Sequence, residues 1–233
     1  RKLFNALELV VAGESDKTAP EKIIIDNDTV LRHVQKNLAI YDKSGEQHYD
    51  IISAFIKSIR GSDPNAAVYW LARMVEGGED PKFIARRMVI LAAEDIGLAN
   101  PNAILLAQAC FESVNVIGWP ESRIILSETA IYLATAPKSN AAYMAIENAQ
   151  ALVREKGDLP VPLNIRNAPT KLMKDLGYHK DYRYAHDYKG NFVKDEFLPG
   201  EISGTRFYDP GSNPREEEIR RRLRNMWNDK YNY

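Results

Sequence analysis

The stretch SDPNAAVYWLARMVEGGEDPKFIARRMVILAAEDIGLANPNAILLAQACFESVNVIGWP, residues 62–120, decides the fold of this chain. It contains three pairs in which an aspartate or asparagine precedes a proline: Asp63-Pro64, Asp80-Pro81 and Asn100-Pro101. Proline disfavours helical geometry in the residue before it and fits the first position of a helix, while Asp and Asn are good N-caps. Each pair therefore predicts the start of a helix.

Glycines predict where these helices end, and the pattern continues on both sides of the stretch. The ends fall at Gly77-Gly78, Gly97 and Gly118. Residues 49–60 form a predicted helix upstream, and residues 121–136 and 139–156 form two more downstream. Because the loops between these helices are short, neighbouring helices are expected to pack antiparallel. The predicted fold class is all-α.

The helix predicted after Pro101 differs from the others in composition. Residues 103–116 are apolar on most faces and include no lysine or arginine. Such a helix is covered either by its neighbours or by another subunit.

The two ends of the chain have a different character. Residues 1–11 have the pattern of the middle of a helix without a preceding cap, so we expect the chain to be part of a larger protein. After Gly157, prolines interrupt the pattern and predict an irregular arm, with a short helix at 170–176, a turn at 187–191 between two extended segments and a terminal helix at 215–229. Glutamates 216–218 precede arginines 220–222 by four residues and should pair with them.

Composition excludes several classes of protein. The net charge of −1 argues against a uniformly basic nucleic-acid coat but permits a local basic patch. One cysteine permits no internal disulfide and favours the cytoplasm. The most apolar stretch carries too many polar residues for a membrane span. The four histidines and the cysteine lack metal-ligand spacing, so no metal site is expected.

No phosphate-binding loop of the form G-x-x-x-x-G-K-[ST] is present. Without it the chain is not expected to hydrolyse ATP by itself.

Two small groups of charges are candidates for binding. Lys57 and Arg60 precede Asp63-Pro64, where a helix N-terminus and two cations could hold a DNA phosphate; capping by Asp63 explains the same residues and is favoured. Arg86-Arg87 and Glu94-Asp95 form either a network between subunits or an ordinary solvated face.

The segment 165–194 is the strongest candidate for a nucleic-acid contact. It contains seven Lys or Arg and three Asp residues, and Lys180, Arg183 and Lys189 are interleaved with aromatic side chains. The aromatic residues are Tyr178, Tyr182, Tyr184, Tyr188 and Phe192. Cations for phosphates and rings for base stacking are typical of single-strand binding surfaces. The alternative, which we weigh more heavily, is that the tyrosines only pack the arm against the helices.

Several ordered motifs resemble one family. They are Tyr41-Asp42-Lys43, His48-Tyr49-Asp50, residues 57–64, residues 67–71, Gly78-Glu79-Asp80-Pro81, Ala85-Arg86-Arg87, residues 94–99, Pro120-Glu121, residues 136–140, residues 163–170 and residues 184–188. In this order they are similar to replication-associated recombination protein A, the bacterial MgsA/RarA group, which is related to the eukaryotic Werner-helicase-interacting ATPase. The resemblance covers nearly the whole chain.

The resemblance implies a clamp-loader-like AAA+ ATPase whose C-terminal helical part forms a homotetramer. It implies a remnant of the AAA+ lid at 1–40, a helical oligomerisation domain at 41–157 and an irregular arm with a C-terminal helix at 158–233. Arg1 falls where the family places its sensor 2 arginine. ATP and Mg²⁺ would be cofactors of the longer parent, with none in this fragment.

The resemblance also implies partners and a place of action. The parent is expected to bind DNA, to act at stalled replication forks, to associate with single-strand-binding protein and to lie in the cytoplasm with the nucleoid. Two other classes stay open. One is a stand-alone helical DNA-binding module that uses the basic, tyrosine-rich arm, and the other is an intact enzyme whose active site carries no recognised motif.

Overall fold

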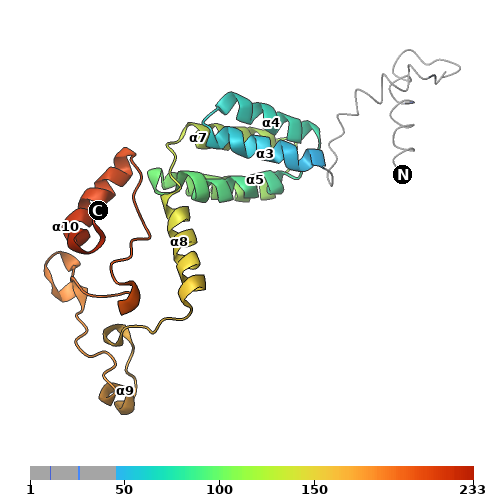
Figure 1. Ribbon diagram of the computed structural model, residues 1–233. Helices are drawn as coiled ribbons and strands as arrows, with labels where there is room; N and C mark the ends of the chain where they lie inside the picture. Colours follow the sequence, from blue (N-terminus) through green and yellow to red (C-terminus); the bar gives the residue numbers. More distant parts are fainter. Residues whose placement is uncertain (1–10, 12–25, 27–45) are drawn as a thin grey trace. The chain divides into compact units, whose positions relative to one another are not determined.

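The computed structural model describes Val11, Asp26 and residues 46–233. In these residues the secondary structure is helical, with eight α-helices and no strand, which confirms the all-α class (Figure 1). The helix expected over residues 1–11 and the lid remnant at 1–40 lie outside the described residues, apart from Val11 and Asp26.

The described helices begin close to the predicted starts. In chain order they are α3 (Glu46–Arg60), α4 (Pro64–Glu76), α5 (Pro81–Leu91), α6 (Asn102–Ile117), α7 (Ser122–Thr135), α8 (Ala141–Lys156), α9 (Lys171–Asp175) and α10 (Pro214–Tyr231). The cap of α4 shows the cause directly. The Oδ1 atom of Asp63 accepts hydrogen bonds from the backbone N–H groups of Asn65, at 3.0 Å, and Ala66, at 2.9 Å.

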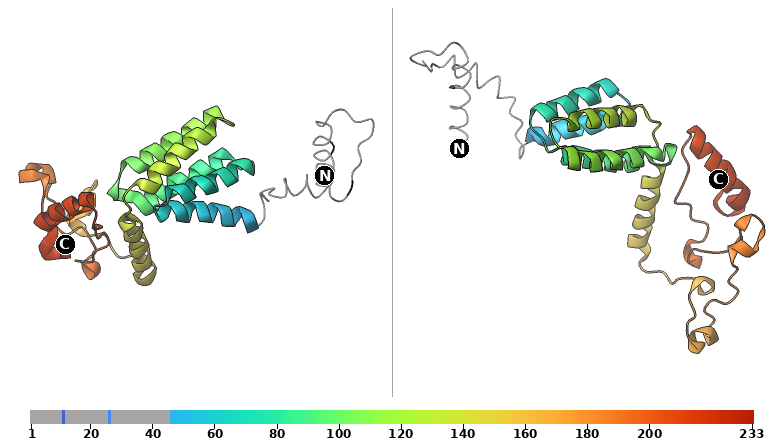
Figure 2. Two further views of the ribbon diagram at one scale, coloured as in Figure 1. Left: turned by 90° about the horizontal axis from the view of Figure 1, so that it is seen from above. Right: turned by 180° about the vertical axis from the view of Figure 1, so that it is seen from behind.

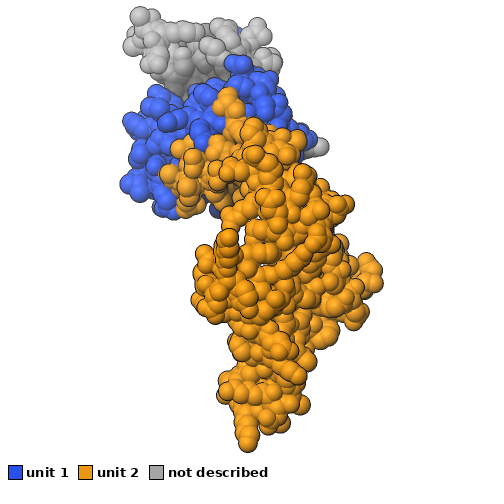
Figure 3. All heavy atoms as spheres, turned by 90° about the vertical axis from the view of Figure 1, so that its left-hand side faces the viewer, with its two compact units in different colours: residues 1–87, 110–134 blue, residues 88–109, 135–233 orange. Residues whose placement is uncertain are grey.

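The chain divides into two compact units, coloured separately in Figure 3. Unit 1 comprises residues 1–87 and 110–134, and unit 2 comprises residues 88–109 and 135–233. In unit 1, α3 packs against α4, and Figure 2 shows the helices of this bundle running side by side. Its fully buried side chains include Phe55, Ile59, Met74, Ile84, Leu126 and Leu133. This apolar interior supplies most of the favourable free energy for folding unit 1.

The backbone after Pro81 stays helical up to the expected stop at Gly97, but only its first part is α-helical. The α-helix α5 ends at Leu91, and the π-helical turn η1 (Ala92–Ile96) and the 3₁₀ turn η2 (Gly97–Ala99) follow it directly. Gly97 has a φ of 48°, and a Cβ atom there would lie 3.0 Å from the carbonyl oxygen of Ser139. The Ser139 N–H donates to the carbonyl oxygen of Asp95 at 2.8 Å. This contact with the segment before α8 accompanies the change from α-helix to π-helix, and no local pattern predicts it.

The irregular arm is built from loops and short 3₁₀ turns. These turns are η3 (Leu163–Ile165), η4 (Ala185–Asp187), η5 (Lys189–Asn191) and η6 (Gly200–Ile202). The predicted turn at 187–191 is present, with Gly190 at a φ of 74°. The backbones of Tyr188 and Phe192 on its two sides are extended, but neither is part of a strand.

The glutamates of α10 do not all pair with arginines as predicted. Glu217 contacts Arg220 at 3.4 Å, three residues away. Glu216 is fully buried and accepts hydrogen bonds from Tyr208 at 3.1 Å and from Asn213 at 2.6 Å. The prediction that Glu216 pairs with Arg220 is therefore wrong, because the first turn of α10 is covered by other parts of unit 2.

Candidate nucleic-acid interface and assembly surface

The cations of the basic arm fall into two groups. The first group holds the arm together: Arg166 donates to the Val161 carbonyl oxygen at 2.6 Å and to the Tyr178 hydroxyl at 3.1 Å. Arg183 donates to the Lys194 carbonyl oxygen at 2.5 Å and contacts Asp195 at 3.4 Å. The side chain of Lys194 contacts Asp229 of α10. These three side chains therefore have a structural role.

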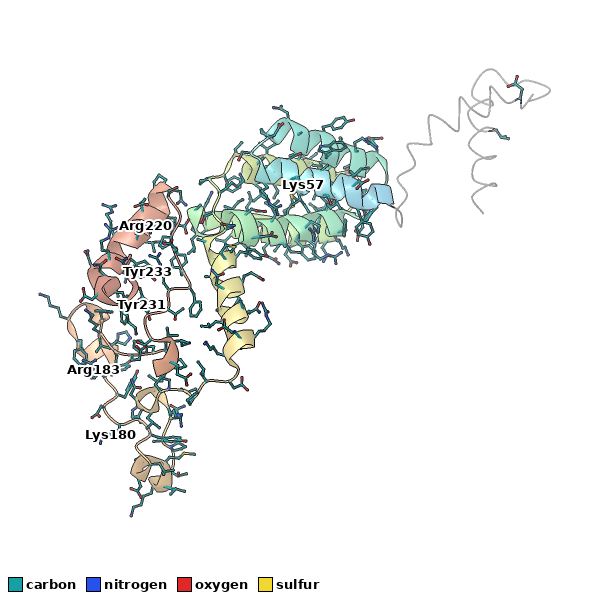
Figure 4. The ribbon with its side chains drawn as sticks, viewed as in Figure 1. Lys57, Lys180, Arg183, Arg220, Tyr231 and Tyr233 are labelled. Carbon is teal, nitrogen blue, oxygen red and sulfur yellow. The ribbon has the colours of Figure 1, made fainter. Side chains whose placement is uncertain are left out.

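The second group of cations is exposed on the arm. Lys171, Lys174, Lys180 and Lys189 make no side-chain hydrogen bond or ion pair within residues 46–233. Figure 4 labels Lys180 and Arg183 on the segment between α9 and α10. Of the predicted DNA-binding residues in the arm, Lys180 and Lys189 are open to a ligand, whereas Arg183 is partly occupied.

The aromatic side chains of the arm are also divided. Tyr182, Tyr184 and Tyr188 are exposed, with 40%, 54% and 42% of their surface accessible. Phe192 instead packs edge-on against Trp227 of α10, with ring centroids 5.0 Å apart. The packing interpretation therefore holds for Phe192. Base stacking on the three exposed tyrosines stays a prediction.

The predicted phosphate site at the start of α4 has no support beyond its charges. Lys57 and Arg60 are exposed in the last turn of α3, and Asp63 occupies the N-terminal N–H groups of α4 as a cap. These two cations belong to unit 1, whereas Lys180, Arg183 and Lys189 belong to unit 2. Arg1, the expected sensor 2 residue, lies outside the described residues.

A buried polar network in unit 2 was not predicted. Burial opposes ionisation of Glu216, but hydrogen bonds from Ser139, Asn213, the Gly211 N–H and Tyr208 hold the pKa of its carboxyl below the usual value. Burial and the charge of Glu216 together raise the pKa of the Tyr208 hydroxyl. The network ties α10 to the start of α8. It is a structural element, since it leaves no open site for a substrate.

A second buried pair lies in unit 1. The Nδ1 atom of His48 is 2.8 Å from a carboxylate oxygen of Glu79, and both side chains are almost fully buried. The Trp119 indole N–H donates to the Glu79 carbonyl oxygen at 3.3 Å. The His48 ring also packs against Phe83, with centroids 5.0 Å apart. This pair joins the start of α3 to the loop before α5.

Within the described ranges, no group of three or more His, Cys, Asp or Glu side chains is placed to hold a metal ion. No helix of the same residues is long and apolar enough to cross a membrane.

Helix α8 has an unusual surface. None of its residues is buried among the residues that the structure describes, and the apolar Ile146 and Val153 are 54% and 60% exposed. Its first turns border a groove of about 550 Å³ in unit 2. The residues that line it are Val89, Ile90, Ala93, Glu94, Ile104, Ala142, Tyr143 and Ile146. Leu105 of α6, in the same unit, is 67% exposed. On soluble proteins, large exposed apolar patches are typical of interaction sites and of ligand-binding grooves.

Two family models match the chain. A model of the AAA C-terminal domain matches residues 1–60, and a model of the MgsA AAA+ ATPase C terminal matches residues 61–227. The chain is thus the C-terminal helical domain of an AAA+ ATPase. It belongs to the MgsA family, which confirms the resemblance of its motifs.

Individual relatives agree with the family. An uncharacterized protein of Thermotoga maritima is 46% identical over 231 residues, covering 99% of this chain and 36% of that protein. Replication-associated recombination protein A of Coxiella burnetii is 42% identical over 224 residues, covering 96% of this chain and 50% of that protein. The ATPase WRNIP1 of Dictyostelium discoideum is 43% identical, covering 90% of this chain and 26% of that protein. The chain spans half or less of the length of these relatives.

Proposed function

We propose that this chain is the assembly-forming region of a DNA-dependent AAA+ ATPase that acts in replication-fork maintenance and recombination. The names of its bacterial relatives support a role in replication-associated recombination. The exposed surface of α8 supports the role in assembly. In this proposal the chain self-associates as a homotetramer. ATP and Mg²⁺ serve the longer protein, which works in the cytoplasm near the nucleoid and contacts DNA and single-strand-binding protein.

The observation that carries the proposal is the absence of any buried residue in α8. An isolated helix of this length is marginal in water, and most helices in proteins are stabilised by packing an apolar face. Within this chain α8 leaves Tyr143, Met144, Ile146 and Val153 more than 40% exposed. A second copy of the chain would cover these side chains and the groove beside them.

Light scattering coupled to gel filtration tests the assembly. We expect a mass four times the 26.4 kDa of one chain. The variant Ile146→Glu places a charge in the groove and should dissociate the assembly, because an unpaired charge buried in an interface costs several kcal/mol. The control Asn148→Glu adds the same charge on α8 outside the groove lining and should leave the mass unchanged. A monomeric wild type at tens of micromolar would refute the proposal.

The proposal also holds that the chain does not hydrolyse ATP by itself. Its sequence contains no phosphate-binding loop, and phosphoryl transfer needs a cradle for the phosphates together with a bound Mg²⁺. Steady ATP turnover that persists at constant specific activity through further purification would contradict this and would favour an intact enzyme.

A second proposed role is contact between the basic arm and single-stranded DNA. The exposed Lys180 and Lys189 beside Tyr182, Tyr184 and Tyr188 support it. The double change Lys180→Glu and Lys189→Glu should weaken binding of a labelled oligothymidylate and reduce its salt dependence. Arg183 is left unchanged in this test because its loss would disturb the contacts with Lys194 and Asp195.

If affinity and salt dependence stay the same in the double variant, the arm serves packing alone. A strongly salt-dependent affinity in a chain that stays monomeric would favour a stand-alone DNA-binding module.

A further inference from the structure

A concave site in the basic arm lies between the segment after η3, the helix α9 and the loop that follows α9. It has a volume of about 730 Å³, within the roughly 300–1,000 Å³ that small-ligand sites occupy. The residues that line it are Asn167, Ala168, Pro169, Lys174, Tyr178, His179 and Lys180. Two cations, two aromatic rings and one amide thus meet in one pocket of unit 2.

The aromatic wall of this pocket is held in place by the arm itself. The Arg166 guanidinium lies over the Tyr178 ring, 5.0 Å from its centroid, and also donates to the Tyr178 hydroxyl. The His179 N–H donates to the Leu163 carbonyl oxygen at 2.9 Å, which fixes the loop after α9 against η3. The His179 ring stacks on Tyr182 with centroids 4.7 Å apart. The rings are therefore positioned before any ligand arrives.

The two cations of the pocket are held differently from Arg166. Neither Lys174 nor Lys180 has a side-chain partner among residues 46–233, so both ammonium groups are available to a ligand. Lys180 stands between His179 and Asp181, and both of these neighbours have a φ of 62°. Residues other than glycine adopt this left-handed conformation at a cost, and such positions cluster at functional sites.

We propose that this pocket takes up one nucleotide of a single DNA strand. Lys174 and Lys180 would contact its phosphate, and the base would lie against Tyr178 and His179. Lysine binds phosphate as a point charge, and aromatic rings stack on any base, so the pocket accepts a nucleotide without reading sequence. This inference rests on the proposed contact between the arm and single-stranded DNA, and it gives that contact a defined centre.

The test uses the whole 233-residue chain. Its ligand is a fluorescent oligothymidylate twelve nucleotides long, with 4-thiothymidine at one internal position. Ultraviolet crosslinking followed by peptide mass spectrometry should place adducts on Tyr178 or His179. The double variant Lys174→Gln and Lys180→Gln should lose most of this adduct. It should also lower the slope of log affinity against log salt by about 1.4, which is two phosphate contacts at about 0.7 each for a single strand.

Lys171→Gln is the matched control. It removes one charge from α9, as the single change Lys174→Gln does, but Lys171 does not line the pocket. Its adduct at Tyr178 and His179 should equal that of the wild type. Circular dichroism of all variants verifies that the fold is intact. An equal loss of adduct in Lys171→Gln and in the double variant would mean that general charge, and not the pocket, draws the strand, and would overturn the proposal.

The remaining outcomes separate the pocket from the arm. If the strand binds but its adducts lie at Tyr184 and Tyr188, the pocket proposal is overturned and the role of the arm survives. If the wild type does not bind the strand, both fail together. Competition adds a check on the ligand. If inorganic phosphate blocks the adduct at the same concentration as thymidine 5′-monophosphate, the site recognises an anion only. That result would overturn the proposed nucleotide site.

Discussion

The buried carboxylate of Glu216 allows a sharp test of how unit 2 is held together. Its side chain is completely inaccessible to solvent. Its two oxygens receive hydrogen bonds from Tyr208, Asn213, Ser139 and the N–H group of Gly211. All four groups donate to a charged carboxylate. Hydrogen bonds to a charged group contribute more to stability than hydrogen bonds between neutral groups.

The variant Glu216→Gln keeps the shape of the side chain but replaces one acceptor by a donor. In the wild type the Nδ2 atom of Asn213 donates to the Oε2 atom of Glu216 at 2.6 Å. If the oxygen of the new glutamine stays toward Tyr208, the NH₂ group of the glutamine takes the place of Oε2 and faces this second donor. Asn213 cannot turn over, because its own oxygen accepts the N–H of residue 216 at 3.0 Å. The Asn213 amide is then an unsatisfied buried donor, which predicts a loss of about 1–3 kcal/mol.

Urea unfolding followed by circular dichroism at pH 7 measures this free energy. Glu218→Gln is the control, because Glu218 lies in the same helical turn but is exposed and should change stability by less than about 0.5 kcal/mol. The pH dependence gives a second readout. Since the pKa of Glu216 is lowered by folding, its contribution is full above the unfolded value of about 4.3 and is lost as pH falls through the folded-state pKa. Equal unfolding midpoints for the two variants at pH 7 would refute the reasoning.

Three further outcomes are expected. Gly211→Ala should destabilise the chain in urea unfolding by about 1–3 kcal/mol, since the new Cβ atom would lie 2.8 Å from the Oε2 atom of the fully buried Glu216. Asp63→Ala should cost about 1 kcal/mol in the same assay, whereas Asp63→Asn, which retains the cap, should cost less. Burial opposes ionisation of Glu196, but hydrogen bonds from Lys230 and Ser203 lower its pKa to about 2. The stability difference between wild type and Glu196→Gln should therefore be present at pH 7 and disappear as pH falls from about 4.5 to about 2, and a difference independent of pH would exclude this pairing.

The helix boundaries were predictable because their causes are local. At Asp63-Pro64 the cap, the restriction on the residue before proline and the first helical position are all properties of adjacent residues, and α4 begins at Pro64 as a result. The same holds for Asp80-Pro81 and for the start of α5. The ordered motifs also identified the family, since a set of short matches in a fixed order is specific even without a structure.

Tertiary structure decided the features that depend on residues distant in sequence. In the sequence Glu216 resembles an exposed helix residue, but folding brings Ser139, from the segment between α7 and α8, against it. The end of α5 at Leu91 accompanies the contact between Gly97 and Ser139. The arm shows the same division within one segment. Its charge and its tyrosines were visible in the sequence. Only the folded structure shows that Arg183 pairs with Asp195 whereas Lys180 lines a pocket, because a cation binds the acceptor that packing places beside it.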